Sequence, residues 1–575
     1  MSRHPAPDPP DQEQHLIIGA GVIVAACILV WTAGQLSGCI WGGTWPQASP
    51  LDSPLILARL IANPGTPNAA WPDAAADLIP VPAAYYGVLA LLVASATIIA
   101  VVAWRLWQSM AAPDDDGARW AQPRDLKPLL VRHPQPGRLT LGTVNGKLIA
   151  TEAQHSVAVI GPAGTGKTTG FAIPALLEWD GPVLATSVKG DLLEDTITHR
   201  RSLGETWVFD PVDSTAEPSA GWSPLHASGD WQGALRMAAW LASTARAGER
   251  GGLQDSDFWY AVAQKLLAPL LLAAATSGAT MADVVRWIDL QDEEQPLRAL
   301  HAADEPDALQ AFAASINREE RTRSSAYTTA ETVLAAFADP GVLATSTKQP
   351  VIDPDRFLDG GNHTLYISGP LHEQARLRPL FTALIEQIVA RVYERANRPD
   401  TRLTKPLLLV IDEAANIAPL PDLAQLASTA RGVGIQLVTV WQDFAQLQAR
   451  YGTFAPTVIN NHRAKVILSG VSDTPTLDYL SRLIGDQAVT EVSETHDKDG
   501  TVQSTTQTTR HRLLAPPNVL RQTDIGSGVL VYGNLHPAQI KLRPWYRGRT
   551  RWLPTLPSGP RSAIPRARTT PKSPS

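Results

Sequence analysis

A glycine-rich segment at residues 161–168, GPAGTGKT, matches the pattern G-x-x-x-x-G-K-[ST] of a phosphate-binding loop. The apolar run SVAVI precedes it and a helix-like segment follows, which is the order of strand, loop and helix that the motif needs. In such a loop backbone N–H groups turn toward phosphate oxygens, Lys167 reaches the β- and γ-phosphates, and the Thr168 hydroxyl can bind magnesium. The sequence therefore predicts an ATP and magnesium site with the nucleotide-binding residues Gly161, Pro162, Ala163, Gly164, Thr165, Gly166, Lys167, Thr168 and Thr169.

Two carboxylates supply the second half of this predicted site. Residues 407–411 of the segment PLLLVIDEAANIAPL have the pattern of a buried parallel strand, and Asp412 and Glu413 follow directly. In parallel α/β sheets ligands bind at the carboxyl ends of the strands. Alone, the two acids could also cap a helix, but beside a phosphate-binding loop they predict a catalytic pair. Asp412 would hold magnesium, directly or through water, and Glu413 would orient or deprotonate the attacking water.

Two further polar residues flank the next strand pattern, IQLVTVWQ. Gln442 ends it, which would place an amide near the γ-phosphate, where it could sense hydrolysis. Arg431, in TARGVGI, lies upstream on a helix-to-strand turn from which it could enter a neighbouring subunit as an arginine finger. Each signal is weak alone, because an arginine near a glycine-rich turn is commonly a surface charge. The predicted catalytic residues are thus Lys167, Glu413, Arg431 and Gln442.

The elements that must position these residues are short apolar runs separated by helical patterns. The runs lie at residues 156–160, 182–187, 206–211, 363–368, 407–412, 435–442, 464–470 and 528–533. Their alternation with helices predicts a doubly wound, mainly parallel α/β sheet. The chain between Lys167 and Asp412 is longer than a minimal core of this kind requires. Residues 231–345 are rich in Ala and Leu at helical spacing, which predicts an inserted all-helical domain.

Two longer apolar runs near the N-terminus contain no charged residue. Residues 16–36 and 85–104 are each long enough to cross roughly 30 Å of hydrocarbon as a helix. The segment 37–84 carries a single cation, Arg59, whereas several cations closely follow the second run. The positive-inside rule then predicts a protein of the inner (cytoplasmic) membrane, with 37–84 outside and the bulk of the chain in the cytoplasm. The competing interpretation of the first run is a cleaved signal with lipoprotein-type processing at Cys39.

A third apolar run, at residues 258–276, is interrupted by Lys265 and Pro269 and is predicted to be too short to span a membrane.

The predicted division of the chain follows from these segments. It comprises an N-terminus (1–15), a first span (16–36), an external loop (37–84), a second span (85–104), a linker and start of the core (105–150), the first part of the nucleotide-binding domain (151–230), the helical domain (231–345), the second part of the nucleotide-binding domain (346–553) and a disordered basic tail (554–575).

Composition sets broader limits. The 575 residues are too many for one ordinary core, and the net charge of −6 gives no overall attraction to nucleic acid. The only cysteines are Cys27 and Cys39, which excludes a zinc cluster or disulfide framework in the C-terminal part.

Residues 493–512 are polar and predict a surface hairpin that turns at Asp499 and Gly500. The tail is either a solvated segment or an electrostatic arm for nucleic acid or anionic lipid.

Together these motifs resemble those of type IV secretion coupling proteins, the TraG-like conjugative DNA-transfer ATPases. The resemblance is carried by the two N-terminal spans, GPAGTGKT, SVKGDL with VFDP and WSPL after it, LLLVIDEAANI, and ARGVGIQLVTVWQDFAQLQARYG, and it extends to about residue 546. It implies a RecA-like core that forms a hexameric, membrane-anchored motor. Such a motor receives a relaxase-bound single strand of DNA, or a protein substrate, and delivers it to a secretion channel by ATP hydrolysis.

The resemblance also implies roles for individual residues. Lys167, Thr168, Asp412, Glu413, Arg431 and Gln442 fall on the ATPase positions of that family. Two other functions remain open from the sequence. One is an FtsK-like translocase of double-stranded DNA, and the other is an adaptor for protein export that binds nucleotide without useful turnover. Glu413 argues against the adaptor, because an adaptor needs no residue to orient water.

Overall fold

The computed structural model describes residues 12–110, 117–188, 190–246, 254–496 and 502–547. The chain divides into two compact units, Met1–Asp115 and Asp116–Ser575. The predicted turn at Asp499 and Gly500 and the predicted basic tail lie outside the described residues.

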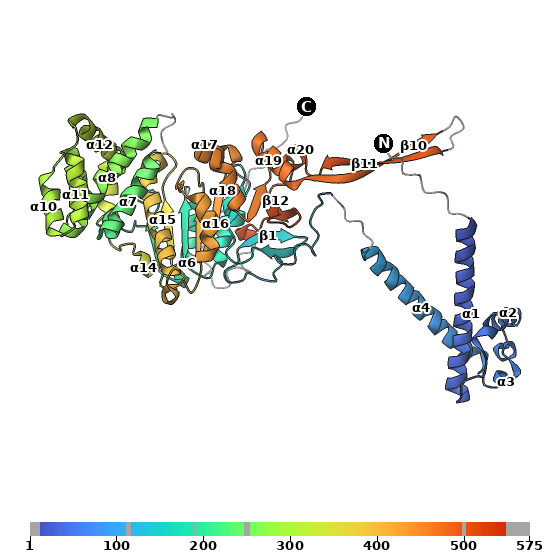
Figure 1. The fold of residues 1–575 in the computed structure, drawn as a ribbon. Helices are drawn as coiled ribbons and strands as arrows, with labels where there is room; N and C mark the ends of the chain where they lie inside the picture. The colour runs from blue at the N-terminus through green and yellow to red at the C-terminus, as the bar shows by residue number, and fades with distance from the viewer. Residues whose placement is uncertain (1–11, 111–116, 189, 247–253, 497–501, 548–575) are drawn as a thin grey trace, which may run out of the picture. The chain divides into compact units, whose positions relative to one another are not determined.

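The N-terminal unit consists of two long apolar helices with short helices between them (Figure 1). The helices are α1 (Gln12–Gly42), η1 (Pro50–Asp52), α2 (Ser53–Ala62), η2 (Pro67–Ala70), α3 (Asp73–Ala76) and α4 (Pro82–Met110). Ile23–Gly42 and Pro82–Arg105 are each long and apolar enough to cross a membrane. The first helix continues past the predicted end at Leu36 to Gly42, and the Trp71 ring packs so closely on it at Gly34 that a Cβ there would lie 1.8 Å from a ring carbon.

The second unit is built on a sheet of eleven strands in the described residues, in the order β2-β1-β13-β12-β9-β3-β8-β7-β4-β6-β5. The strands are β1 (Thr140–Val144), β2 (Lys147–Ala150), β3 (Val157–Ile160), β4 (Val183–Ser187), β5 (Thr206–Phe209), β6 (Thr364–Ser368), β7 (Leu407–Ile411), β8 (Ile435–Trp441), β9 (Ala464–Leu468), β12 (Ser527–Tyr532) and β13 (Ala538–Lys541). The run from β9 to β5 is parallel, whereas β12, β13, β1 and β2 pair antiparallel. The predicted mainly parallel α/β fold is confirmed.

The sheet separates two hydrophobic layers, and alternate residues of each strand enter opposite layers. In β7 the side chains of Leu407, Leu409 and Ile411 join one layer. Leu408 and Val410 join the other. All five are fully buried, as expected for a parallel strand covered by helices on both faces. Apart from the helices of residues 231–345, the helices of this unit are η3 (Thr168–Ala172), α5 (Ile173–Glu178), α6 (Asp191–Leu203), η4 (Pro224–Ala227), α14 (Pro354–Phe357), α15 (Gln374–Ala396), η6 (Pro399–Thr401), α16 (Leu423–Val433), α17 (Phe444–Tyr451), η7 (Gly452–Phe454), α18 (Ala455–Asn461), α19 (Thr474–Ile484), α20 (Pro517–Arg521) and η8 (Trp545–Arg547).

The sequence analysis missed three antiparallel strands, β1, β2 and β13. A signal for the first two was present, because the dipeptide Asn145-Gly146 between them is the strongest short-range indicator of a two-residue hairpin. Both residues have positive φ, 49° and 76°, as that turn requires. The strands themselves are only four or five residues long, so their period of two is hard to recognise.

Helices occupy the chain between β5 and β6 and group at one end of this unit (Figure 1). From Trp231 onward they are α7 (Trp231–Arg246), α8 (Gln254–Ser277), α9 (Met281–Asp289), α10 (Glu294–Ala302), α11 (Pro306–Ile316), α12 (Glu320–Val333), η5 (Ala335–Ala338) and α13 (Pro340–Thr345). By length and composition alone Phe258–Ser277 could also cross a membrane, so shortness of the run is not a sufficient reason to exclude a span, but 67% of its apolar window is buried inside this unit. Its apolar residues instead form the centre of this group, where α7, α10, α11 and α12 pack around α8.

A ribbon of two strands completes the unit. β10 (Asp486–His496) and β11 (Val502–Leu513) pair with each other and not with the large sheet. The ribbon is longer than the hairpin predicted at 493–512, because β10 begins at Asp486, seven residues before Ser493. The ribbon projects from the sheet and its helices (Figure 1).

One buried arginine joins α5, α6 and the amino ends of β4 and β6. The side chain of Arg200 is fully buried. Its guanidinium donates to Thr364 Oγ1 (2.7 Å) and to the carbonyl oxygens of Trp179 (2.8 Å), Gly181 (2.8 Å) and Asn362 (3.0 Å). Arg200 therefore satisfies four acceptors that water does not reach.

Replacing this arginine tests its structural role. We expect Arg200→Met to lower the free energy of unfolding of residues 116–575 by about 3–5 kcal/mol, because four buried acceptors lose their donor. The matched control is Arg201→Met, since Arg201 is exposed and pairs with Glu217, and it should cost less than about 1 kcal/mol. Urea unfolding followed by circular dichroism measures both. Equal stability of the two variants would contradict the role assigned to Arg200.

Candidate nucleotide-binding site

The phosphate-binding loop follows β3, which lies between β8 and β9 in the middle of the sheet. Gly164 and Gly166 have φ values of 81° and 87°, a region that glycine adopts without strain. These conformations curl the loop so that successive backbone N–H groups can face an anion. The helix that begins at Thr168 opens with a π-helical turn and continues as α5, so its N-terminal end faces the loop. The positive end of a helix dipole also favours phosphate.

Lys167 ends the loop and folds back over it. Its ammonium group donates hydrogen bonds to the carbonyl oxygens of Gly161 and, at 2.9 Å, Pro162. The Thr165 hydroxyl also donates to Pro162 O (2.9 Å). Gly161 is itself in close contact, because a Cβ there would lie 3.0 Å from Leu468 Cβ. The carbonyl groups of Gly161 and Pro162 thus hold Lys167, and Thr165 helps to shape the loop. None of these three residues lines the cavity that Lys167, Asp412 and Glu413 share.

Asp412 lies directly after β7, at the same edge of the sheet. Its Oδ2 accepts a hydrogen bond of 3.4 Å from the Thr168 hydroxyl, and the Thr186 hydroxyl donates to its backbone oxygen at 3.2 Å. The residue is 7% exposed. Burial, followed by the charges of Glu413 and Asp191, raises the pKa of Asp412 to about 6, against the opposing effect of Lys167. This carboxylate therefore carries a charge for which the surrounding protein compensates only in part.

Glu413 adopts a backbone conformation that is rare for its type. Its φ is 55°, in the left-handed region, where a residue other than glycine is strained. The chain turns sharply there, with Ala414 N–H donating to Val440 O of β8 (3.1 Å). The carboxylate accepts a hydrogen bond from Asn416 Nδ2 (3.4 Å). The turn is what brings Glu413 to the cavity instead of continuing the direction of β7.

These groups surround a cavity of about 350 Å³. Its lining consists of Ala163, Gly164, Gly166, Lys167, Thr168, Thr169, Val188, Asp191, Asp412, Glu413 and Gln442. The structure thus brings the loop, the two acids and Gln442 together, although they come from three strands far apart in the sequence. Gln442 is held by its backbone N–H, which donates to Gln446 Oε1 (3.1 Å).

Asp191 is the residue of this cavity that sequence reasoning did not select. It begins α6, directly after Gly190 with φ 75°, and its charge contributes to the raised pKa of Asp412. The signal was the segment SVKGDL, in which an acid follows the carboxyl end of a predicted strand.

A second cavity, also of about 350 Å³, lies on the other side of the loop. It shares Gly164, Gly166 and Thr169 with the first. Its remaining lining is Thr165, Gly170, Asp524, Ile525, Gly526, Ser527, Lys541, Leu542, Pro544, Tyr546 and Arg547. The loop therefore touches both a cavity with three acids and a cavity whose lining combines two cations and an acid with a phenol ring and apolar side chains.

Arg431 is not brought to this site. It is exposed in the last turn of α16, before the amino end of β8, whereas Gln442 follows the carboxyl end of that strand. A strand rises about 3.3 Å per residue, so the length of β8 separates Arg431 from its own loop by roughly 20 Å. Two hydrogen bonds fix α16 at that edge, from Ser156 Oγ to Ala427 O (2.8 Å) and from Asn461 Nδ2 to Ala424 O (2.8 Å).

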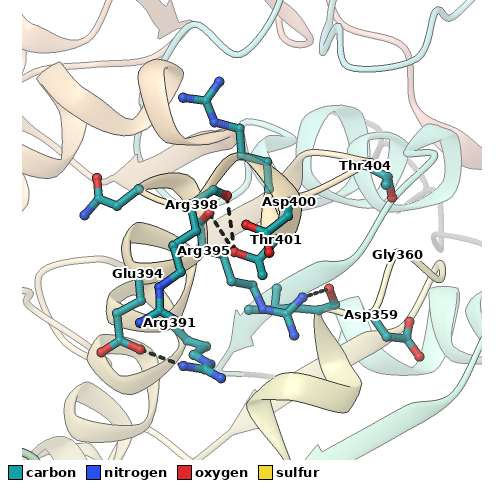
Figure 2. A pocket seen from close by; sticks show the side chains of 12 residues that line it. Asp359, Gly360, Arg391, Glu394, Arg395, Arg398, Asp400, Thr401 and Thr404 are labelled. Carbon is teal, nitrogen blue, oxygen red and sulfur yellow. Dashed lines mark hydrogen bonds and ion pairs between the residues drawn. The ribbon is translucent and has the colours of Figure 1, made fainter.

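A larger cavity, of about 750 Å³, lies before the amino ends of β6 and β7 and is lined by several arginines (Figure 2). Two of those arginines already bind groups of the protein. Arg391 donates to Glu394 (2.8 Å) and Asp355 (2.8 Å), and Arg395 donates to Leu358 O (2.6 Å). The lining contains no glycine-rich loop, so it lacks the backbone N–H groups by which the loop after β3 can bind a triphosphate.

The raised pKa of Asp412 gives a pH-dependent prediction. A carboxyl whose pKa is 3.8 when unfolded and about 6 when folded costs the folded state stability above pH 6, and the cost disappears as the pH falls toward 4. Without nucleotide, Asp412→Asn should therefore raise the free energy of unfolding of residues 116–575 at pH 7.5 by up to about 3 kcal/mol. Near pH 4 the gain should vanish.

Urea unfolding at both pH values measures this effect. The exposed carboxyl of Asp400 provides the control, and Asp400→Asn should change stability little at either pH. Added magnesium and nucleotide should reverse the order at pH 7.5, because only the wild-type carboxylate can bind the cation. An Asp412→Asn variant less stable than wild type at pH 7.5 without ligand would contradict the prediction.

Comparison with known proteins agrees with the resemblance drawn from the motifs. The conjugal transfer protein TraG of Escherichia coli is 25% identical over 460 residues, 70% of each chain. VirD4 of Rhizobium rhizogenes is 24% identical over 413 residues, 69% of this chain and 59% of VirD4.

Solved structures of the same fold include two of a coupling protein. The unbound bacterial conjugative coupling protein TrwBdeltaN70 has a TM-score of 0.57 at 20% identity and covers 74% of this chain and 92% of its own. The plasmid coupling protein TrwB in complex with ADP and Mg²⁺ has a TM-score of 0.56 at 20% identity, over 74% of this chain and 94% of its own. A family model described as type IV secretory system conjugative DNA transfer matches residues 119–563. The chain belongs to this family.

Proposed function

We propose that this chain is a membrane-anchored, ATP-driven motor that couples a relaxase-bound single strand of DNA, or a protein substrate, to a type IV secretion channel in conjugative transfer. The observation that carries the proposal is the single cavity at which Lys167, Thr168, Asp412, Glu413 and Gln442 meet. Those groups suit triphosphate hydrolysis, and the family of the chain is one of conjugative DNA transfer. The apolar helices α1 and α4 would hold the motor at the inner membrane, with the second unit in the cytoplasm.

The residues present fit a magnesium ion. Thr168 Oγ1 and Asp412 Oδ2 lie 3.4 Å apart, and hydroxyl and carboxylate oxygens are ligands that magnesium prefers. The raised pKa of Asp412 indicates a buried charge that a divalent cation would compensate. When bound, magnesium would neutralise charge on the β- and γ-phosphates. Lys167 would bind the same phosphates by leaving its loop carbonyls, and Glu413 would orient the attacking water and accept its proton.

The cavity on the far side of the loop suits the remainder of the nucleotide. Its apolar and aromatic lining, with Leu542, Ile525 and Tyr546, could receive the base, and Asp524 offers a carboxylate that could accept hydrogen bonds from ribose hydroxyls. A nucleotide that passed over Gly164 and Gly166 would then reach both cavities. This assignment extends the predicted nucleotide-binding residues to the C-terminal part of the core.

The position of Arg431 supports action across subunits. Because it lies at the edge of the sheet opposite its own loop, it cannot contact a phosphate bound there. In a ring of six chains the exposed edge of one subunit can face the nucleotide of the next. Arg431 would then stabilise the transition-state charge as an arginine finger, and hydrolysis would require neighbouring chains.

Specific observations favour this proposal over the two alternatives. The TraG relative is a conjugal transfer protein and the matching family model is one of conjugative DNA transfer, which favours conjugative transfer over an FtsK-like double-stranded DNA translocase. Glu413 lines the cavity through a strained backbone conformation that a nucleotide-binding adaptor would not need.

Hydrolysis by residues 116–575 and by the full chain tests the motor. We expect magnesium-dependent ATPase activity that single-stranded DNA stimulates. Lys167→Ala should abolish nucleotide binding, while Glu413→Gln should retain binding and lower kcat by at least about 100-fold, because only the water-orienting carboxylate is lost. Fluorescent nucleotide binding and phosphate release measure the two steps. Oligomers of the wild-type chain that bind ATP but never hydrolyse it, with or without DNA, would instead support the adaptor.

Mixing inactive variants tests the role of Arg431. Arg431→Ala and Lys167→Ala should each be inactive alone, the first because the finger is missing and the second because the phosphate site is missing. In a mixed ring, an intact nucleotide site can adjoin an intact Arg431, so phosphate release should partly recover. The control mixes Lys167→Ala with Glu413→Gln, which damage the same site and should recover nothing. Absence of recovery in the first mixture, with ring formation shown by light scattering, would contradict action across subunits.

A further inference from the structure

The ribbon of β10 and β11 forms a sheet of its own, separate from the large sheet. Its strands pair antiparallel from Asp486 opposite Leu513 to His496 opposite Val502, with Thr490 opposite Thr509. It extends away from the sheet and helices of its unit (Figure 1). At its base Leu514 N–H donates to Gly485 O (3.0 Å), and Ala118 N–H donates to Asp486 O (2.6 Å).

The ribbon does little to stabilise itself. Residues 505–513 are exposed without interruption, so both faces of β11 lie in solvent. Val492 of β10 is 54% exposed. Fixing a residue costs roughly 1–2 kcal/mol of conformational entropy, and a hairpin of two strands without an apolar face is at best marginally stable in water. A ribbon of this length therefore gains most of its stability from a further contact.

The strand edges are suited to such a contact. Proteins usually protect an exposed strand edge with proline, lysine or a short strand. Neither β10 nor β11 contains proline or lysine, and both are long and rich in β-branched residues. The base of β10 already binds backbone beyond β11, because the segment at Gly117 and Ala118 lies against Asp486 to Ala488 and donates one backbone hydrogen bond to Asp486 O. Beyond Ala488 the same edge continues through Thr490 and Val492.

The two strands carry opposite charge. β10 contains acids and neither lysine nor arginine, whereas β11 contains Arg510 and Arg512 and no acid. Within the ribbon both arginines pair with one acid, Glu491, at 3.3 Å for Arg510. One positive charge on β11 is therefore in excess. An acidic strand edge and a basic strand edge on the same element complement each other between copies.

We propose that the ribbon binds a second copy of this chain, with the outer edge of β10 pairing antiparallel with the outer edge of β11 of the adjacent subunit. The pairing is head to tail, so repetition around a ring joins all ribbons into one continuous sheet. It places acidic β10 against basic β11 at every junction and leaves no strand edge open. The proposal rests on the ring of the proposed function and adds the surface by which neighbouring chains recognise each other.

Disulfide cross-linking of the full chain in native membranes tests the pairing. Both chains carry Cys27→Ser and Cys39→Ser and different affinity tags. One also carries Thr490→Cys on β10. Its partner carries a single cysteine on β11, at Thr505, Thr506, Gln507, Thr508 or Thr509 in turn. Each chain then holds one thiol, so a disulfide can form only between chains. The matched control replaces Thr332, an exposed threonine on α12.

The proposal predicts a tagged heterodimer that forms at alternate β11 positions, because side chains of a paired strand point to the two faces in turn. Thr490→Cys should not link to itself, since two β10 strands would be separated by one β11 and lie about 10 Å apart, beyond the reach of a disulfide. The Thr332→Cys control should give less than about a tenth of the yield.

Three outcomes would overturn the proposal. They are no heterodimer at any position, equal linking at all positions, and a dominant Thr490→Cys homodimer, which would indicate a two-fold pair instead of a ring contact. ATPase activity and the mixing of Lys167→Ala with Arg431→Ala are measured on the same preparations. If ATPase activity recovers in the mixed rings but the ribbons do not cross-link, only the proposed pairing of the ribbons is contradicted. If the ribbons cross-link but the chain does not hydrolyse ATP, only the proposed motor function is contradicted.

Discussion

The parallel direction of neighbouring strands is the constraint on which the site depends. Because β3, β7 and β8 run the same way, their carboxyl ends meet at one edge, and whatever residues follow those strands must lie together. The loop after β3, Asp412 after β7 and Gln442 after β8 occupy those places. The same constraint sends Arg431, which precedes β8, to the opposite edge. One geometric rule thus brings three of the four predicted catalytic residues, Lys167, Glu413 and Gln442, to one edge of the sheet and places Arg431 at the other.

The sequence was most informative where one local pattern determines one local structure. GPAGTGKT fixes a strand, a loop and a helix within twenty residues, and apolar runs such as 407–411 are buried on both faces, so their composition alone reveals them. The antiparallel strands β1, β2 and β13 were missed because each is only four or five residues long, although β1 pairs with β2 through a two-residue turn and β13 pairs with the nearby β12. The inserted helices were predictable as helices. The central position of α8 in the helical group was not, because it depends on how α7, α10, α11 and α12 pack around it.

Residues whose role depends on tertiary contact were the hardest to select. Asp191 matters because it approaches Asp412, and Tyr546 because the chain returns to the phosphate-binding loop after more than three hundred residues. Neither carries a motif of its own. Glu413 was selected from its place after a strand, yet its positive φ, which directs it into the cavity, cannot be read from the residue type. Sequence patterns identify the groups, and packing decides which of them meet.

The pairing of β1 with β13 links residues 398 positions apart. A ribosome adding about 5–20 residues per second needs roughly 20–80 s to synthesise the chain between them. During that time α1 and α4 have already been synthesised. β3, which precedes the phosphate-binding loop, is also complete, but its neighbours in the sheet, β8 and β9, are made later. The sheet therefore remains open at both sides of the loop until the last of these strands has been made. In vectorial synthesis the two apolar helices precede every strand that completes the nucleotide site, so a nascent chain presents its apolar helices before it can form that site.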